Sequence, residues 1–403
     1  MSRAKRVRLC MQDLFHQDVV EMIERETRRY EVWSIETPDH PDFQPAYEML
    51  WGAFGPSGEM EREPAIRKFL LDDSYEPTAE GTFIRYFLMV AKDADGRVRG
   101  ARDGSVLVNP RYAPDLCVVY LSHIFMAPDS RGTVLSYWLR IAPMEVAVQY
   151  LKDLSALGKL ALPDPTAPGK TFGMRVDLAA EMEYFDPADR ISWQRILFYG
   201  RGGFDAINPR HFPYLQPDFR DPETIRATGN RPVPFMVLLR RMGRERQATV
   251  PIDEARAVMR LLYDDFACHC APDILANSLQ LVLDRLEERA KQKAFVELLP
   301  LPTGVANLAR LKRLFRYTAF TKYYPDEPDT RGYLEGGVRD RLAQNPGYLE
   351  QELARIAAEI SARPTYVYAS RQKDFSWQGL PTPPDDVEPA LEEDARAPDA
   401  GST

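Results

Sequence analysis

The stretch of sequence that decides the fold is LCVVYLSHIFMAPDSRGTVLSYWL, residues 116–139. Its first part, residues 116–126, is short, apolar and rich in β-branched and aromatic residues, which predicts a buried central strand. Pro128 and Gly132 end that pattern, and a helix is expected over residues 134–151. A turn between a strand and a helix presents free backbone N–H groups and the positive end of the helix dipole. This junction is therefore a candidate site for a pyrophosphate.

Strands and helices are expected to alternate on both sides of this stretch. The clearest example is a hairpin of strands 83–92 and 97–108, because two β-rich runs flank the turn sequence Asp-Ala-Asp-Gly. The pattern predicts a mixed α/β domain over residues 1–245. The remaining elements expected there are strands at 29–36, 174–184, 204–208 and 233–240 and helices at 43–53 and 188–199.

The chain after residue 245 is expected to be built differently. Between residues 246 and 380, apolar side chains recur at helical spacing, which predicts a helical extension. Residues 381–403 are rich in proline and acidic residues that cannot build a core, so we expect a disordered acidic tail.

Composition and charge exclude several classes of protein. The chain has 403 residues, of which 44% are hydrophobic, enough to bury a core. Its 52 basic and 60 acidic residues give a net charge of −8, and the tail alone holds seven acidic residues against one basic residue. Because the rest is nearly neutral, we do not expect nucleic acid to bind through bulk positive charge.

The cysteine content and the hydropathy pattern favour a soluble cytoplasmic protein. Four cysteines are too few for a disulfide framework and suit a reducing compartment. The basic N-terminus is not followed by the apolar segment of a signal peptide, and no run of 18 apolar residues could span a membrane. The sequence Cys268-His269-Cys270 has no second pair at ligand spacing, so no metal site is expected.

A second segment makes a family resemblance specific. Residues 195–204 read RILFYGRGGF and follow the strand-like segment AEMEYFDP at 180–187. Together with the strand, turn and helix of residues 116–139, this order resembles the GNAT superfamily of acyl-CoA-dependent N-acyltransferases, which shares the pattern Arg-Ile-x-Phe-Tyr-x-x-x-Gly-Phe. The resemblance covers about residues 28–245, and the rest of the chain has no recognised counterpart.

The resemblance implies a fold, a co-substrate and a set of site residues. The implied fold is a GNAT-like mixed central sheet flanked by helices, and the implied reaction transfers an acyl group from acetyl-CoA to a primary amine. Tyr199 would protonate the departing sulfur, while a backbone N–H at the end of the central strand would polarise the thioester carbonyl. The residues implied to bind acetyl-CoA are Phe125 and Met126 at the pantetheine arm and Arg131, Gly132, Thr133, Val134, Leu135 and Ser136 at the pyrophosphate.

The base that accepts the amine proton is less constrained. An amine with a pKa of about 10.4 is mostly protonated at pH 7, so a carboxylate or a histidine is needed. Glu181 and Glu183 are two apart on a predicted strand and so share one face, which is either the cleft or a solvated surface. In related enzymes the positions of Tyr120 and Ser122 face the substrate. His123 is then expected to be structural, unless a β-bulge reverses the alternation.

One departure from the family keeps a second hypothesis open. Val134 and Ser136 stand where the family usually has glycines, and side chains there restrict close approach of the backbone to phosphate. The alternative is a non-catalytic binding or scaffold module of the same fold that has lost tight CoA binding. The sequence leaves the acceptor open between a small-molecule amine and a protein lysine, and it leaves the oligomeric state open.

Overall fold

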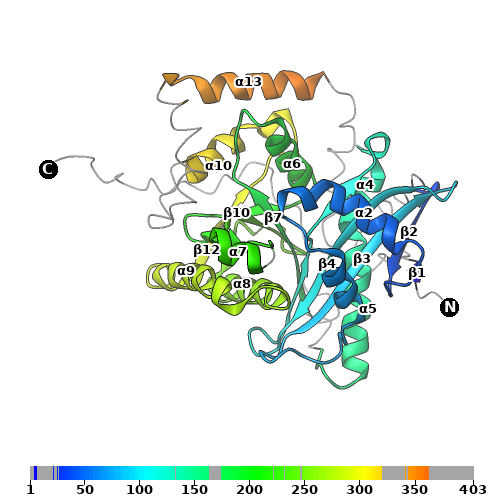
Figure 1. The fold of residues 1–403 in the computed structure, drawn as a ribbon. Helices are drawn as coiled ribbons and strands as arrows, with labels where there is room; N and C mark the ends of the chain where they lie inside the picture. Colours follow the sequence, from blue (N-terminus) through cyan, green and yellow to red (C-terminus); the bar gives the residue numbers. More distant parts are fainter. Residues whose placement is uncertain are drawn as a thin grey trace.

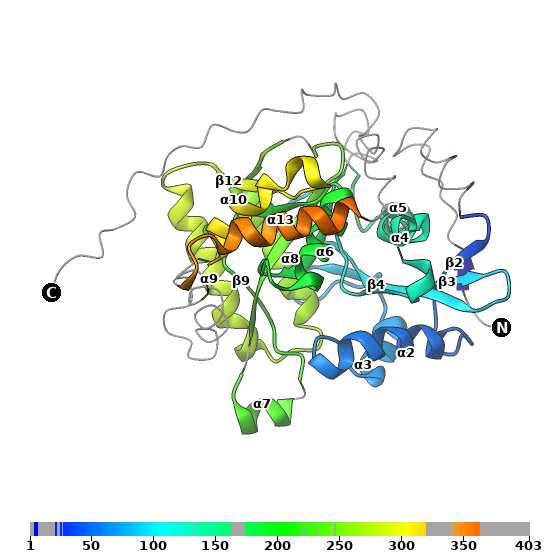
Figure 2. The ribbon, with the colours of Figure 1, turned by 90° about the horizontal axis from the view of Figure 1, so that it is seen from above.

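The computed structural model of the protein describes residues 4–6, 21, 25, 27–131, 133–162, 174–220, 222–230, 232–245, 247–319, 341 and 344–362. Within these residues the chain forms one large mixed sheet with helices on both faces (Figure 1, Figure 2). This confirms the expected mixed α/β sheet flanked by helices. In the described part, no helix is both long and apolar enough to cross a membrane.

The sheet follows the order β1-β2-β3-β4-β5-β7-β10-β8-β12-β11, with β6 paired to β4 and β9 paired to β10. Neighbouring strands are antiparallel except β5 and β7, which are parallel and therefore need a crossover connection. The strands are β1 (Ala4–Arg6), β2 (Tyr30–Ile35), β3 (Phe83–Asp93), β4 (Val98–Val108), β5 (Leu116–Tyr120), β6 (Ile124–Met126), β7 (Arg175–Glu183), β8 (Asp205–Ile207), β9 (Tyr214–Gln216), β10 (Val233–Arg241), β11 (Thr249–Pro251) and β12 (Phe295–Pro300).

Helices cover both faces of the sheet. Seen from above, α2 and α3 lie on one side of β3 and β4, and α4 and α5 lie on the other (Figure 2). The helices are α2 (Phe43–Phe54), α3 (Glu63–Leu71), α4 (Val134–Ile141), α5 (Pro143–Ala156), α6 (Arg190–Arg201), α7 (Pro222–Thr228), α8 (Ile252–Phe266), α9 (Pro272–Ala290), α10 (Ala309–Ala319) and α13 (Tyr348–Ser361).

Local chemistry accounts for one success and one error of the sequence prediction. The β3–β4 hairpin forms as predicted, because Gly96 takes a positive φ of 78° and the Asp93 carboxylate accepts the N–H groups of Asp95 and Arg97. The single helix predicted over residues 134–151 is wrong. It divides into α4 and α5 at Pro143, which lacks an N–H and is tolerated only in a first turn.

Side chains that alternate along the strands divide the core between two faces. On one face, Leu178 and Met182 of β7 pack with α4, α5 and α6. On the other, Ala179 of β7 packs with α8 and α9, and Leu88 of β3 packs with α2 and α3. We call these the α6 face and the α8 face of the sheet.

The segment after residue 245 belongs to the same sheet. It contributes the strands β11 and β12 as well as helices, and β12 pairs with β8. Val258 and Leu262 of α8 share one apolar cluster with Val118 of β5 and Val237 of β10. The domain boundary at residue 245 stays a prediction, and the tail predicted over residues 381–403 lies outside the described residues.

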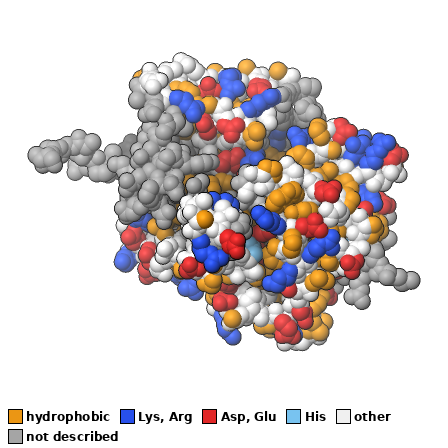
Figure 3. Space-filling view, viewed as in Figure 1, with side chains coloured by type: hydrophobic (Ala, Val, Ile, Leu, Met, Phe, Trp, Pro, Cys, Tyr) orange, Lys and Arg blue, Asp and Glu red, His pale blue; other side chains and the backbone are white. Residues whose placement is uncertain are grey.

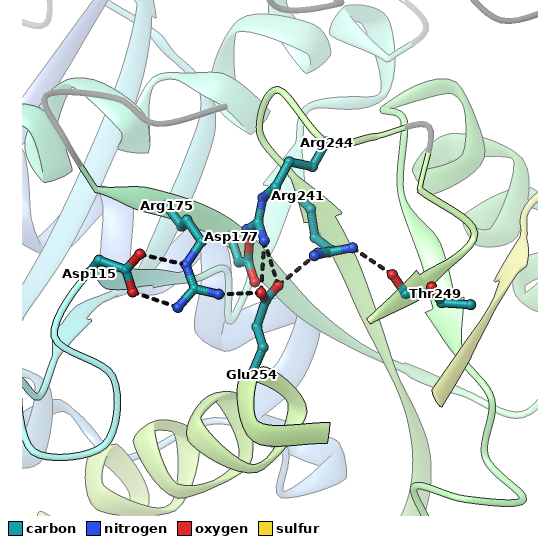
Figure 4. A network of polar contacts seen from close by, with 7 residues as sticks. All are labelled: Asp115, Arg175, Asp177, Arg241, Arg244, Thr249 and Glu254. Atoms are coloured by element: carbon teal, nitrogen blue, oxygen red, sulfur yellow. Dashed lines mark hydrogen bonds and ion pairs between the residues drawn. The ribbon is translucent and has the colours of Figure 1, made fainter. Parts of the chain in front are cut away.

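A buried network of ion pairs connects the start of α8 to the sheet (Figure 4). The Glu254 carboxylate accepts from Arg175 at 2.5 Å and from Arg241 and Arg244, each at 2.7 Å. Arg244 also donates to Asp177 on β7 at 2.6 Å. Burial alone would raise the pKa of Glu254, but Arg244 and Arg241 hold it below its usual value. The network therefore keeps its charges matched inside the protein.

Candidate active site

The parallel strands β5 and β7 separate in the middle of the sheet. They are paired from Leu116 and Arg175 to Tyr120 and Ala179, and the Leu121 N–H makes the last contact, 2.8 Å from the Ala179 carbonyl. In the described structure β6 then continues on β4, whereas the end of β7 continues on β10. The two central strands thus diverge on either side of a strand split.

The split corrects the prediction of one continuous strand over residues 116–126. The chain leaves the regular ladder at residues 121–123. There the Asp103 carboxylate, on β4, accepts the His123 N–H at 2.9 Å and lies 2.9 Å from Nδ1 of the same histidine. The Asp103 side chain thus replaces a backbone carbonyl as the acceptor of the His123 N–H. The apolar run in the sequence does not indicate this replacement.

Neighbouring residues of β4 give the two faces of the split opposite charge. Arg102 points to the α6 face, where Nη1 donates to the Leu139 carbonyl of α4 at 3.2 Å. Asp103 points to the α8 face, where it contacts His123 and accepts from the Tyr86 hydroxyl at 2.9 Å. Acidic and basic side chains are intermixed on the surface seen in Figure 3.

Arg102 is a buried cation with spare hydrogen-bond donors. The residue is fully buried, and among the described residues its Nε and Nη2 atoms have no hydrogen-bond partner. Burial lowers its pKa to about 10, which still leaves the guanidinium charged at neutral pH. A buried donor without a partner carries a desolvation cost, which an anion that entered the split from this face would relieve.

Tyr199 lies at the end of α6 on the same face. The residue is 7% exposed, and its ring meets the Phe204 ring edge-on at a centroid distance of 5.4 Å. Burial raises the pKa of the phenol, although Arg102 and Arg195 act against this rise. The hydroxyl therefore keeps its proton at neutral pH, as a proton donor must.

The Gly-Phe part of the motif has a structural reason. Gly203 takes a positive φ of 75°, which favours glycine. The turn lets the Phe204 N–H donate to the Tyr199 carbonyl at 3.2 Å and places the two rings in contact. The motif thus closes α6 and positions Tyr199.

The residues predicted at the pantetheine and pyrophosphate are arranged as follows. Arg131 turns back over β6, with Nε 3.1 Å from the Met126 carbonyl and its guanidinium 5.0 Å from the Phe125 ring centre. Leu135 is buried in the core of the α6 face, so only its backbone can meet a ligand. Gly132 and the side chain of Val134 lie outside the described residues.

The first turn of α4 fits an anion in one respect. Its N-cap, Thr133, makes no side-chain cap, because the Thr133 hydroxyl donates to the Ser130 carbonyl at 2.7 Å. The Ser136 hydroxyl likewise donates to the Thr133 carbonyl at 2.7 Å. Both hydroxyls are thus engaged, and the backbone N–H groups at the start of α4 are what the loop offers an anion.

The two predicted base candidates have different partners. Glu181 accepts from the Tyr214 hydroxyl and from Gln216 at 2.8 Å, both on β9. Glu183 instead pairs with Arg195 of α6 at 3.0 Å. The two carboxylates therefore do not act as a pair in one cleft. Burial raises the pKa of Glu181 to about 8, although Gln216 and other neighbours oppose the rise.

A cavity of about 190 Å³ opens beside the split on the α8 face. Tyr120 and Ser122, which were predicted to face the substrate, line it, and so does His123, because the strand is interrupted there. The lining contains no lysine or arginine among the described residues. Its acidic residues are Glu61, Asp72, Asp73, Glu76, Asp103 and Asp265.

Two of these acids are paired with histidines. His269 lies 2.8 Å from Glu61, and His123 contacts Asp103. Burial would lower both histidine pKa values, but Glu61 raises that of His269 to about 10 and Asp103 raises that of His123 to about 9. Both imidazoles are therefore protonated at neutral pH and cannot act as bases.

Sequence reasoning missed most of this cavity. His269 was considered only as a metal ligand, although it lines the cavity together with Asp265, four residues before it. Glu61 and Asp103 come from distant segments, and no spacing links them to His269. Within the described residues, no group of three or more histidines, cysteines or acids is arranged to hold a metal ion.

The comparisons with known proteins are sparse. No family model and no curated protein matches the sequence. One similar solved structure is a protein assigned as a phosphinothricin N-acetyltransferase, with 14% identity and a TM-score of 0.27 over 52% of this chain and 98% of that chain. Another is a GNAT-superfamily phosphinothricin acetyltransferase from Sinorhizobium meliloti in complex with AcCoA, with 19% identity and a TM-score of 0.19 over 40% and 62%. At such TM-scores the similarity carries no argument about activity.

Proposed function

We propose that the protein transfers an acyl group from acetyl-CoA to a primary amine through the split between β6 and β7. The observation that carries this proposal is the charge on the two sides of the split. Arg102 lies on the α6 face, and an acidic cavity lies on the α8 face. An anionic donor and a cationic acceptor would thus be attracted to opposite faces and meet between the strands.

The α6 face suits the donor. CoA carries several phosphate charges, and the N-terminus of α4 together with the spare donors of Arg102 supplies groups that favour an anion. Arg131 would leave the Met126 carbonyl so that the pantetheine arm can pair with β6. When bound, acetyl-CoA supplies the activated acyl carbon.

Tyr199 is assigned the role of general acid. In the transfer, the amine nitrogen forms a bond to the acyl carbon and the carbon–sulfur bond breaks. The sulfur leaves with the electron pair and takes the phenolic proton. The raised pKa of Tyr199 keeps that proton in place until it is needed.

The α8 face supplies the base. Burial raises the pKa of Glu181 to about 8, although Gln216, Tyr120 and the nearby His123 act against the rise. A bound ammonium lowers this pKa, so the carboxylate can then accept the amine proton. Glu183, which pairs with Arg195, is assigned a water-orienting role next to Tyr199.

The alternative is a binding module of the same fold without catalysis. It is favoured by the contact of Arg131 with the Met126 carbonyl, which closes the site assigned to the pantetheine arm. It predicts that acetyl-CoA does not bind, or binds without turnover.

The experiment measures acetyl-CoA binding by calorimetry and thiol release with a panel of amines. We expect binding and turnover, and Tyr199→Phe should lower kcat by about 10²–10⁴-fold with little change in the affinity for acetyl-CoA. Tyr30→Phe, the same change at a buried tyrosine on the distant strand β2, should leave kcat unchanged. No binding at millimolar acetyl-CoA, or full activity of Tyr199→Phe, would refute the proposal.

A further inference from the structure

The cavity on the α8 face has an exposed rim and a buried floor. Its exposed acidic residues, Asp72, Asp73 and Glu76, follow the end of α3. Its buried acidic residues include Asp103 and Asp265, and Asp265 is only 8% exposed. A ligand that enters therefore meets carboxylates at two depths.

Most of these carboxylates are already paired with a cation. At the rim, Asp72 lies 3.9 Å from Lys68, and Glu76 lies 2.6 Å from Lys159. At the floor, Glu61 and Asp103 are paired with protonated histidines. These pairs neutralise one another and add little attraction for a ligand.

Two carboxylates remain, one at each depth. Within the described residues, neither Asp73 nor Asp265 forms an ion pair. The Asp73 carboxylate accepts the Tyr75 N–H at 3.0 Å. Burial raises the pKa of Asp265 to about 7, with His269 and Ser105 acting against the rise. A buried carboxylate in this state gains from a cation placed beside it.

Aromatic side chains also line the cavity. Phe69 lines the cavity with its ring 5.4 Å from Tyr86 and 5.3 Å from His269. Phe219 contacts His269 in the same way at 5.4 Å. Ring faces and edges suit both methylene groups and ammonium groups.

We propose that the cavity binds a short aliphatic diamine, with one ammonium group at Asp73 and the other at Asp265. This rests on the proposed function, because it names the acceptor of the same transfer. Its volume of about 190 Å³ is below the roughly 300–1,000 Å³ of sites for drug-sized ligands, which favours a small molecule. The inner nitrogen would lie near Ser122 and Tyr120, at the strand split.

The test is calorimetry of the full chain with 1,4-diaminobutane and 1-aminobutane, which differ by one charge, at low ionic strength. We expect the diamine to bind about three- to fivefold more tightly, as an exposed charge pair allows. Asp73→Asn should abolish that preference and leave 1-aminobutane unchanged. Asp265→Asn should weaken both ligands by about tenfold or more, because this carboxylate is buried.

Controls separate this inference from the proposed function. Asp284→Asn, on the exposed side of α9, should change neither affinity. Equal binding of the two amines, no binding, or an Asp73→Asn effect no larger than that of Asp284→Asn would overturn the diamine site. Because calorimetry needs no acyl transfer, the predicted affinity pattern without thiol release would uphold the site and refute the transferase.

Discussion

The two faces of the strand split handle buried charge in different ways. On the α8 face, carboxylates are balanced by histidines that fold next to them, as His123 does on Asp103. On the α6 face, Arg140 and Arg240 donate to carbonyls at the C-terminal end of α6, those of Phe198 and Gly202. Arg102 has no comparable set of partners among the described residues. The comparison shows that, in the described part of the chain, the acidic side chains lining the cavity of the α8 face are paired with cations except at Asp73 and Asp265. The α6 face keeps a cation, Arg102, whose Nε and Nη2 have no hydrogen-bond partner among the described residues.

The network around Glu254 is a third arrangement of buried charge. Its carboxylate is paired with three arginines (Figure 4). The effect of a substitution in this network can be compared with the effects of substitutions on the two faces of the split.

The largest effect is expected in this network. Glu254→Ala should lower the free energy of unfolding by about 3–5 kcal/mol, because it leaves buried arginines without their partner. Urea denaturation measures the loss. Glu287→Ala, which breaks an exposed pair with Arg256, should cost less than about 1 kcal/mol. Equal losses in the two variants would mean that the network is not a buried, matched cluster.

The histidine pairs of the α8 face should make stability depend on pH. The folded-state pKa values of about 9 for His123 and about 10 for His269 lie above the unfolded value of about 6.5. The contribution of the two protonated histidines to the free energy of unfolding is therefore complete below pH 6.5. It is lost as pH rises to 10, which lowers the free energy of unfolding by a few kcal/mol. Denaturation between pH 6 and pH 10 measures this. His269→Gln should flatten the decline, and an unchanged slope would contradict the pairing.

On the α6 face, we expect a substitution of Arg102 to lower function while the stability of the protein is retained. Arg102→Met removes a buried cation whose donors lack partners, so thermal stability should hold or rise. Acetyl-CoA binding should weaken by about 1.5–3 kcal/mol, the value of hydrogen bonds to a charged group. Calorimetry and thermal melting of one sample give both numbers. Unchanged affinity together with a large loss of stability would make Arg102 purely structural.

The smallest effect concerns the turn that positions Tyr199. Gly203→Ala should cost about 1 kcal/mol of stability, because alanine disfavours the positive φ. Gly96→Ala, at a similar φ in an open turn far from the split, should cost about the same. Only Gly203→Ala should also lower kcat. A loss of activity in both variants, or in neither, would remove the link between this turn and Tyr199.

Local patterns predicted the elements better than their junctions. The β3–β4 hairpin and the helix that carries Tyr199 near its C-terminal end were predicted, because turn residues and helical spacing act over a few positions. The interruption at residues 121–123 was not, because it depends on Asp103, which is twenty positions away from His123.

The sequence by itself determined the mixed sheet, the order of strand, turn and helix after Leu116, and the placement of Tyr199 at the end of a helix. Hydrophobic periodicity and turn chemistry are local, so they can be read along the chain. Only the tertiary structure decided that Arg102 and Asp103 face opposite sides of a split, and that Glu61, Asp103, Asp265 and His269 line one cavity. The reason is physical: charge balance inside a protein is set by neighbours in space, and these neighbours come from four separate elements and loops.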